Sequence, residues 1–285
     1  ISADGVDLNT TTTQAGVTIL TSAALTTDNA INIGGDDLSI TADSVVESGS
    51  TVITANDLSL TVANEADIGG TNALGGSVSG TVGGALTVNN GQVLDFGALS
   101  SSSLTSTITG AGGITDSGSI TSGAVNLDTS ATNGAISLDD DGNALSGTVT
   151  VVAGTGNVTL DNNTTDLGLI ITSANDVTIE DAGAVSLAGT VSNNLSITGA
   201  TGVTDSAALS VTGTTGITTT SDGAVVLDTD TNALTGTVTV SSGAGAITLD
   251  NNATDLTLVT TSTGAVTVED AGALVIEGSM GSLDV

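Results

Sequence analysis

The segment "LDNNTTDLGLIITSANDVTIEDAGAV" (Leu160–Val185) returns 89 residues later as "LDNNATDLTLVTTSTGAVTVEDAGAL" (Leu249–Leu274). Residues 134–189 align with residues 223–278 without a gap, and about 34 of the 56 positions are identical. So regular a repeat indicates an architecture in which one structural unit stacks on the next.

The same 89-residue offset holds upstream, where "ITGAGGITDS" (Ile108–Ser117) matches "ITGATGVTDS" (Ile197–Ser206). Residues 1–103 contain only weaker matches to these motifs. We therefore predict a single β-helix over residues 1–285, made of diverged coils (1–103), two near-regular supra-repeats (104–278) and a last segment with no evident cap (279–285).

Short runs inside the repeat alternate apolar and hydroxyl residues, as in "TVTV" (Thr148–Val151), "VTI" (Val177–Ile179) and "LSI" (Leu195–Ile197). Alternation with a period of two predicts strands that bury one face, and β-branched residues favour such a surface. Gly, Asn, Asp and Ser between the runs favour turns. The spacing of the runs, about 8–10 residues, is typical of sandwiches, barrels and solenoids alike. The long repeat favours a solenoid, and specifically a parallel β-helix.

The number of strand-like runs in each repeat gives the expected length of a coil. About ten strand-like runs in each 89-residue repeat make about five coils of roughly 18 residues. A chain of 285 residues would then form about sixteen coils. With a spacing of about 4.8 Å between coils, it would make a rod roughly 75 Å long.

The composition agrees with a thin, aliphatic core. Hydrophobic residues make up 38% of the chain, yet Phe96 is its one aromatic residue. There are 31 acidic residues and no Lys, Arg, His or Cys. Because phosphates are bound largely by Lys and Arg, we expect no nucleic-acid partner. No stretch approaches the roughly 18–20 apolar residues of a membrane span, so we expect no membrane insertion.

The runs "GAITLDNNATDL" (Gly245–Leu256) and "GAVTVEDAGAL" (Gly264–Leu274), together with the "ITGATGVTDS" elements, resemble repeats of large bacterial filamentous-haemagglutinin-type adhesins. The resemblance covers residues 104–278 well and residues 1–103 loosely. It implies export through an outer-membrane partner, a right-handed parallel β-helix, and an extracellular or cell-surface location.

An acidic motif, D-x-D-x-N, occurs once in each repeat. Carboxylate and amide oxygens are the ligands that Ca²⁺ prefers, so the motif is a candidate metal site. However, the distal bidentate Glu of a full calcium loop is absent. Asp and Asn also form ordinary β-helix turns, which is the alternative. We expect no cofactor besides this candidate Ca²⁺. The motif residues are Asp139, Asp141, Asn143, Asp228, Asp230 and Asn232.

The turns "DNNTTD" (Asp161–Asp166) and "DNNATD" (Asp250–Asp255) place two Asn residues side by side in each repeat. Asn side chains on successive coils can stack as ladders that satisfy their own amide groups. We therefore expect these Asn residues to have a structural role between coils.

Two acidic pairs, Glu180–Asp181 and Glu269–Asp270, follow strand-like runs, and we expect them to face water. Carboxylate pairs can hydrolyse glycosides, but no basic or aromatic lining for a sugar accompanies these pairs. Without His or Cys, nucleophilic triads centred on His are excluded as well. We predict that the chain is not an enzyme.

These observations predict a structural stalk or fibre segment of a secreted bacterial cell-surface adhesin-like protein, which supplies length, stiffness and protease resistance. The alternative is an extracellular filament or sheath subunit that stacks end to end. The expected partners are other copies of the chain or the rest of a longer solenoid, together with divalent cations that the 31 carboxylates would attract.

Overall fold

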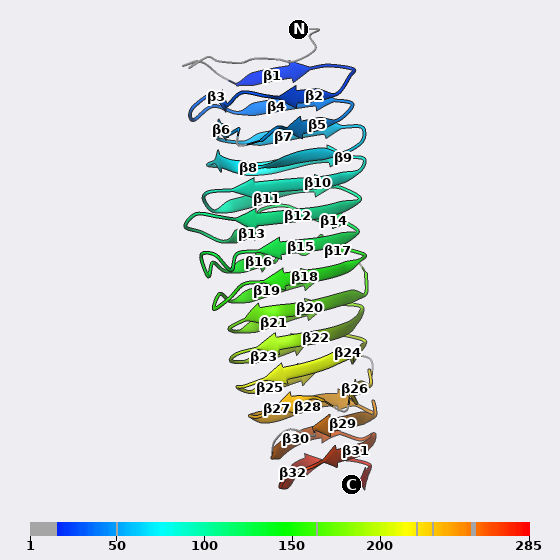
Figure 1. Cartoon of the computed structure of the whole chain (residues 1–285). Coiled ribbons are helices and arrows are strands. Elements are labelled where there is room, and N and C mark those ends of the chain that lie inside the picture. Colours follow the sequence, from blue (N-terminus) through cyan, green and yellow to red (C-terminus); the bar gives the residue numbers. More distant parts are fainter. Residues whose placement is uncertain (1–15, 50, 164, 221, 230, 252–254) are drawn as a thin grey trace. The chain divides into compact units, whose positions relative to one another are not determined.

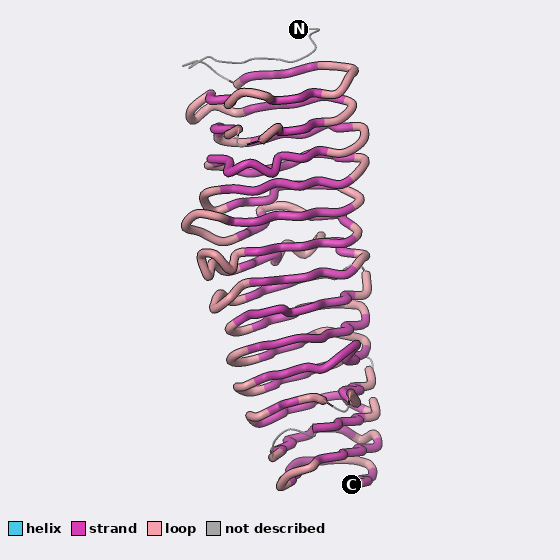
Figure 2. The backbone as a smooth tube through the Cα atoms, in the orientation of Figure 1, coloured by secondary structure: helices cyan, strands magenta, loops and turns pink. Residues whose placement is uncertain are grey.

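The protein is described by a computed structural model that covers residues 16–49, 51–163, 165–220, 222–229, 231–251 and 255–285. All regular structure in these ranges is β-strand (Figures 1 and 2), which confirms the predicted all-β class. The chain forms two compact units, Ile1–Gly147 and Thr148–Val285.

The strands of the first unit are β1 (Val17–Leu20), β2 (Leu25–Thr27), β3 (Ile31–Asn32), β4 (Leu38–Ala42), β5 (Val45–Glu47), β6 (Ile53–Ala55), β7 (Leu58–Val62), β8 (Ala66–Leu74), β9 (Ser77–Val82), β10 (Ala85–Asn90), β11 (Leu94–Ser100), β12 (Ser103–Ile108), β13 (Ile114–Asp116), β14 (Ile120–Ser122), β15 (Ala124–Asp128), β16 (Ile136–Leu138) and β17 (Ala144–Leu145).

These strands form two stacks of parallel strands. One stack runs in the order β1, β4, β7, β9, β11, β13 and β16. The other runs in the order β2, β5, β8, β10, β12 and β15. Short strands extend the coils at their corners, where β3 pairs with β6, β6 with the end of β8, and β11 with β14 and then β17. The predicted parallel β-solenoid is confirmed, because chain-neighbouring strands alternate between the stacks.

Like residues lie above one another inside the first unit. Leu38 pairs in register with Leu58, Leu58 with Val78, and Val78 with Phe96. All four side chains are fully buried. Each such side chain contributes about 1.5–3 kcal/mol relative to leaving it in water. Stacked aliphatic columns therefore form the thin core that the composition predicted, with Phe96 as its one large member.

The strands of the second unit are β18 (Thr148–Val152), β19 (Val158–Asn162), β20 (Leu167–Ala174), β21 (Val177–Asp181), β22 (Ala184–Val191), β23 (Leu195–Thr198), β24 (Gly202–Val211), β25 (Thr215–Thr218), β26 (Val225–Leu227), β27 (Ala233–Leu234), β28 (Thr237–Gly243), β29 (Ile247–Asn251), β30 (Leu256–Ser262), β31 (Ala265–Asp270), β32 (Leu274–Ser279) and β33 (Ser282–Asp284).

The second unit has the same two-stack arrangement. One stack runs β19, β21, β23, β25, β28, β30 and β32. The other runs β18, β20, β22 and β24, then divides over β26 and β27, and continues as β29, β31 and β33. Figure 1 shows the successive coils of this unit in green to red.

Most coils are longer than the predicted 18 residues. The register step between coils is 18 residues from Val78 to Phe96, 20 from Leu38 to Leu58, and 23 from Thr215 to Val238. The longest step includes the wide turns that flank β26 and β27. Sixteen coils were therefore too many for the chain, because these turns lengthen the coil without adding strands to a stack.

This coil length places the two copies of the repeat on different stacks. Within the second unit, β19 belongs to the β19–β32 stack, whereas its counterpart 89 residues on, β29, belongs to the other. Likewise β21 and its counterpart β31 lie in different stacks. At about 20 residues per coil, 89 residues make about four and a half coils rather than the predicted five. One sequence motif thus appears on both sides of the solenoid.

Candidate functional site

Asn143 closes the first D-x-D-x-N turn from inside the coil. Its side chain is fully buried. Its Oδ1 accepts a hydrogen bond from the Ile120 N–H at 2.7 Å, and its Nδ2 donates to the Asp116 Oδ2 at 2.7 Å. An amide suits this position because it supplies both an acceptor and donors, as a peptide group does. Asn143 thus links its own coil to the preceding one.

Asp116 anchors the same turn from the preceding coil. Its Oδ1 accepts the Asp139 N–H at 2.8 Å, and its Oδ2 accepts the Asp140 N–H at 3.3 Å. Burial raises the pKa of the Asp116 carboxyl, and the nearby Asp139 charge adds to this, while the hydrogen bonds from Asn143 and the two N–H groups oppose it. One carboxylate therefore fixes three donors of the turn above it.

The second D-x-D-x-N turn repeats this geometry. Asp205 accepts the Asp228 N–H at 3.2 Å, the Thr229 N–H at 3.1 Å and the Asn232 Nδ2 at 2.6 Å. The Asn232 Oδ1 accepts the Leu209 N–H at 2.8 Å. Because every partner lies 89 residues from its counterpart in the first turn, the hydrogen-bond arrangement is itself a repeated feature.

The structure separates the members of the predicted metal site. The amide oxygens of Asn143 and Asn232 point into the coil and bind backbone N–H groups. Among the described residues, no group of three acidic side chains is arranged to hold a metal ion. The turn role is thus directly visible, and calcium binding stays a prediction that now depends on the exposed carboxylates. Those are Asp139, Asp141 and Asp228, whereas Asp230 lies outside the described residues.

Sequence reasoning missed Asp116 and Asp205, although they carry these turns. Both stand in the matched segments "ITGAGGITDS" and "ITGATGVTDS", directly before a Ser. The available signal was the spacing of 27 residues between this Asp and the Asn of the D-x-D-x-N motif, which is the same in both repeats.

Other buried Asn residues link coils in the same way. Asn90 accepts the Leu74 N–H at 3.0 Å and donates to the Leu74 carbonyl at 3.0 Å. Asn72 pairs in register with Asn90 and accepts the Ile53 N–H at 2.7 Å. The two Asn residues are stacked on neighbouring coils outside the D-N-N turns, but their amides bind backbone groups and Glu47 rather than each other, so the pair is not the predicted Asn ladder.

The first Asn of each D-N-N turn is also buried. Asn251 accepts the Leu234 N–H at 2.7 Å. In the strand register, however, Asn162 lies beside Asp181 and Asn251 beside Asp270. These Asn residues therefore have the predicted structural role between coils, with an Asp rather than another Asn as the neighbour.

The Glu–Asp pairs do not both face water. Glu180 and Glu269 are exposed, as predicted. Asp181, by contrast, is only 1% exposed, and Asp270 is intermediate. The prediction was wrong for Asp181 because it continues the inward alternation of β21 rather than following the strand.

The Asp181 carboxyl has a strongly shifted pKa. Burial raises it to about 7, and the negative charges of Asp166 and Asp161 act in the same direction. Hydrogen bonds from the Gly183 N–H and from Asn162 lower it, but they do not offset burial. This is the most perturbed carboxyl among the groups whose pKa shift is resolved.

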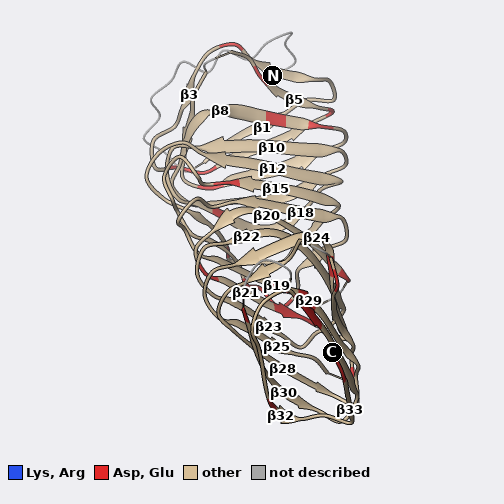
Figure 3. Ribbon diagram, turned by 60° about the horizontal axis from the view of Figure 1, so that its bottom comes forward, with Lys and Arg blue, Asp and Glu red and all other residues tan. Residues whose placement is uncertain are grey.

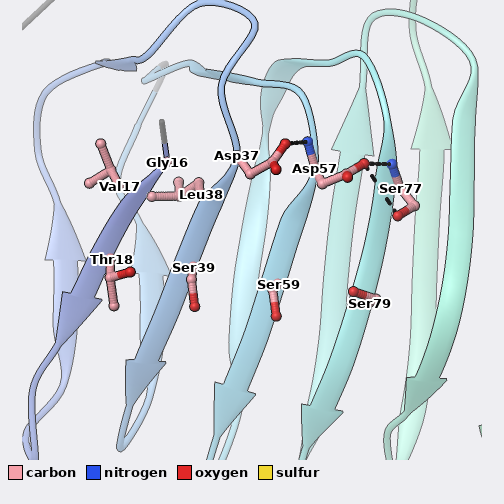
Figure 4. A pocket seen from close by; sticks show the side chains of 10 residues that line it. All are labelled: Gly16, Val17, Thr18, Asp37, Leu38, Ser39, Asp57, Ser59, Ser77 and Ser79. Atoms are coloured by element: carbon pink, nitrogen blue, oxygen red, sulfur yellow. Dashed lines mark hydrogen bonds between the residues drawn. The ribbon is translucent and has the colours of Figure 1, made fainter. Parts of the chain in front are cut away.

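A shallow groove of about 450 Å³ lies on the outer face of β1, β4, β7 and β9 (Figure 4). Asp37 accepts the Asp57 N–H at 3.2 Å, and Asp57 accepts the Ser77 N–H at 2.7 Å. The hydrogen bonds from Asn56 and Asp57 lower the pKa of Asp37. The two carboxylates at this side of the groove therefore accept hydrogen bonds from backbone N–H groups of the next coil. A column of hydroxyl residues in register lines the floor, namely Thr18, Ser39, Ser59 and Ser79.

The remaining acidic residues are spread over many coils (Figure 3), and the sequence contains no Lys or Arg to pair with them. No helix in the described part of the chain is long and apolar enough to cross a membrane.

Comparison with known proteins gives one match. Residues 83–152 and 174–241 match the model of a family described as "Repeats of unknown function (DUF5649)". The matched segments end 89 residues apart, as the internal repeat requires, and together cover slightly less than half of the chain. No curated protein and no solved structure matches it. The matched repeats and the stacked parallel strands together show that the chain is a repeat protein of the parallel β-helix type.

Proposed function

We propose that the chain is a structural stalk or fibre segment of a secreted bacterial cell-surface adhesin-like protein. The observation that carries this proposal is the in-register pairing of each coil with the next along each unit. Such a stack resists bending and pulling because every coil is held by a ladder of parallel hydrogen bonds.

The buried polar groups support a mechanical rather than a catalytic role. Asn143 and Asn232 bind backbone N–H groups of a neighbouring coil, and Asp116 and Asp205 bind the turns above them. Side chains that would be candidates for chemistry are thus used to hold coils together. We therefore propose that the chain is not an enzyme.

An extracellular location is part of the proposal. The chain has no Lys or Arg and one aromatic residue, so trypsin-like proteases find no cleavage site and chymotrypsin-like proteases almost none. The resemblance to haemagglutinin-type repeats points in the same direction. Antibody against the chain should label intact producing cells. Labelling only after the cells are lysed would contradict a surface location.

Electron microscopy of the purified chain at neutral pH tests the stalk role. Separate, straight rods are expected from a segment whose stiffness comes from stacked coils. Rounded or collapsed particles with an unchanged circular dichroism spectrum would contradict a stiff segment.

A second candidate function is end-to-end assembly into a filament, in which the coil that holds Ile276 and Leu283 would pair with a coil of another copy. Leu283 points toward the inside of the coil, beside Val266, yet is 49% exposed. Ile276, also inward-facing, is only partly buried. Apolar interior groups and strand edges of this kind favour pairing with a further β-coil.

Two substitutions at neighbouring residues add the same charge on opposite faces of β32. Comparing them distinguishes an effect on the stacking surface from an effect of the added charge alone. Ile276→Lys places a charge on the inward face of β32 and should abolish fibres. Val275→Lys, on the outward face of the same strand, should leave them intact. Fibres that survive Ile276→Lys would rule out stacking through this end.

Divalent cations are the proposed partners of the acidic outer surface. With 31 carboxylates and no cation in the chain, Ca²⁺ can bridge neighbouring rods. Light scattering should rise with Ca²⁺ and fall again with a chelator. If Asp139→Asn with Asp141→Asn leaves the response unchanged, the cation acts on the general surface and not at the D-x-D-x-N turn.

A further inference from the structure

The carboxyl of Asp181 lies inside the solenoid. Along β21 the inward residues are Val177, Ile179 and Asp181, and all three are almost completely buried. Glu180 between them is exposed. Asp181 therefore occupies a position that an aliphatic residue fills elsewhere in the coil.

The surroundings of Asp181 leave its carboxylate poorly compensated. Its Oδ1 receives a long hydrogen bond, 3.5 Å, from the Asn162 Nδ2, and the Gly183 N–H also acts on the carboxyl, but these bonds do not offset burial. Its Oδ2 is buried and has no hydrogen-bond partner. The coil on the other side approaches closely, since a Cβ at Gly199 would lie 2.9 Å from the Asp181 carbonyl oxygen.

The charges that face this carboxyl are all negative. Asp161 on β19 is 7% exposed, and Asp166 accepts the Ala184 N–H at 2.9 Å across the same corner. Glu180 points outward from the same strand. The segments 182–184 and 195–200, which also pack here, contain no titratable residue. The chain has no Lys, Arg or His, so it offers no positive charge of its own.

We propose that Asp161, Asp166 and Asp181 form a proton-operated clasp, in which a proton on Asp181 keeps the coil closed and its loss loosens the turn leading into β22. Protonation removes the buried charge at the centre of the cluster. Ionisation places a third negative charge beside Asp161 and Asp166, and solvation of that charge requires the corner to open.

The direction of the pH dependence follows from the raised pKa of Asp181. An ordinary Asp in an unfolded chain has a value of 3.8, and burial raises it to about 7 in the fold. A group of this kind contributes its stability fully below pH 3.8 and loses it as the pH rises through about 7. The clasp is therefore closed in acid and loosened above neutrality.

The second repeat supplies a matched control. Asp250, Asp255 and Asp270 correspond to the clasp residues at the 89-residue offset. Asp270 is intermediate in exposure, whereas Asp181 is 1% exposed, although the Oδ2 atoms of both are buried without a hydrogen-bond partner. Asp270→Asn therefore makes the same chemical change at a less buried position of the second repeat.

Thermal unfolding of the whole chain from about pH 4 to about pH 8 tests the clasp. The melting temperature of the unsubstituted chain should fall across this range. Asp181→Asn, neutral at every pH, should flatten part of the fall and melt a few degrees higher at the alkaline end. Asp270→Asn should follow the unsubstituted chain. Parallel curves for Asp181→Asn and the unsubstituted chain would overturn the proposal.

A measurement without substitution covers the case in which Asp181→Asn does not fold. Carboxyl ¹³C resonances of the unsubstituted chain should show Asp181 titrating near neutrality. Amide exchange in residues 182–184 should accelerate with pH more than in residues 271–273, the equivalent segment of the second repeat. Complete titration of every Asp below about pH 5.5, or equal acceleration in the two segments, would refute the clasp.

Discussion

Asn143 and Asp116 share a hydrogen bond of 2.7 Å between Nδ2 and Oδ2, although they are 27 residues apart in the chain. Asn232 and Asp205 share the equivalent bond at 2.6 Å, again 27 residues apart. The separation is one coil plus a turn, so each bond fastens a turn to the coil beneath it. These bonds explain why the D-x-D-x-N motif ends in Asn.

Replacing Asn232 with Ala should lower the free energy of unfolding by about 1–3 kcal/mol. The change leaves the buried Leu209 N–H without its acceptor and takes a donor from Asp205. Denaturant unfolding measures the loss. Asn157, which is exposed, is the control, and Asn157→Ala should change stability by less than about 1 kcal/mol. Equal losses for the two variants would contradict a special role for the buried amide.

Gly189→Ala should destabilise the second unit by more than about 3 kcal/mol. Gly189 has a φ of 115°, and a Cβ there would lie 1.9 Å from the Ile171 carbonyl oxygen. Gly168 on β20 has no atom closer than 4.0 Å to such a Cβ. Gly168→Ala should therefore alter the unfolding midpoint only slightly. A folded Gly189→Ala variant with the original midpoint would show that the coils can separate to admit the methyl group.

Phe96→Ala should lower the free energy of unfolding by about 3–5 kcal/mol, because it removes the largest fully buried side chain and leaves a cavity. Phe96→Leu restores an aliphatic member of the column and should cost less than about 1.5 kcal/mol. Val93→Ala, at a position that is 51% exposed, is the surface control. Similar costs for Phe96→Ala and Phe96→Leu would indicate that the core around Phe96 collapses to fill the space.

Adding salt should stabilise the chain. All of its 31 charged side chains have the same sign, so screening reduces repulsion without weakening any ion pair. Raising NaCl from about 0.01 to about 0.15 M shortens the Debye length from about 30 to about 8 Å, and the melting temperature should rise. NaCl and KCl should act equally at matched ionic strength. A melting temperature that falls with salt would contradict net repulsion as the dominant electrostatic effect.

The sequence by itself determined the parallel β-solenoid. The long repeat required stacked units, and the alternation in runs such as "VTI" (Val177–Ile179) placed one residue face inside. Both signals are local or strictly periodic, so they can be read along the chain without knowing which strands meet. The thin aliphatic core followed from composition, because an interior of this width admits few side chains as large as Phe96.

Only the tertiary structure decided the coil length, and with it the identity of the partners. Wide turns around β26 and β27 lengthen a coil without disturbing the alternation, so the run count gave about five coils per repeat where four and a half are present. The partner of Asn143 depends on that length, since Asp116 is reached only by closing a full coil. Asp181 shows the same limit from another side. In the alternating pattern of β21, Asp181 falls on the same side of the strand as Val177 and Ile179, which predicts an inward position. Its charge, by contrast, predicts an exposed one. The register against Asn162 and the close approach of Gly199 decide for burial, because a residue fixed between two coils cannot rotate away from them.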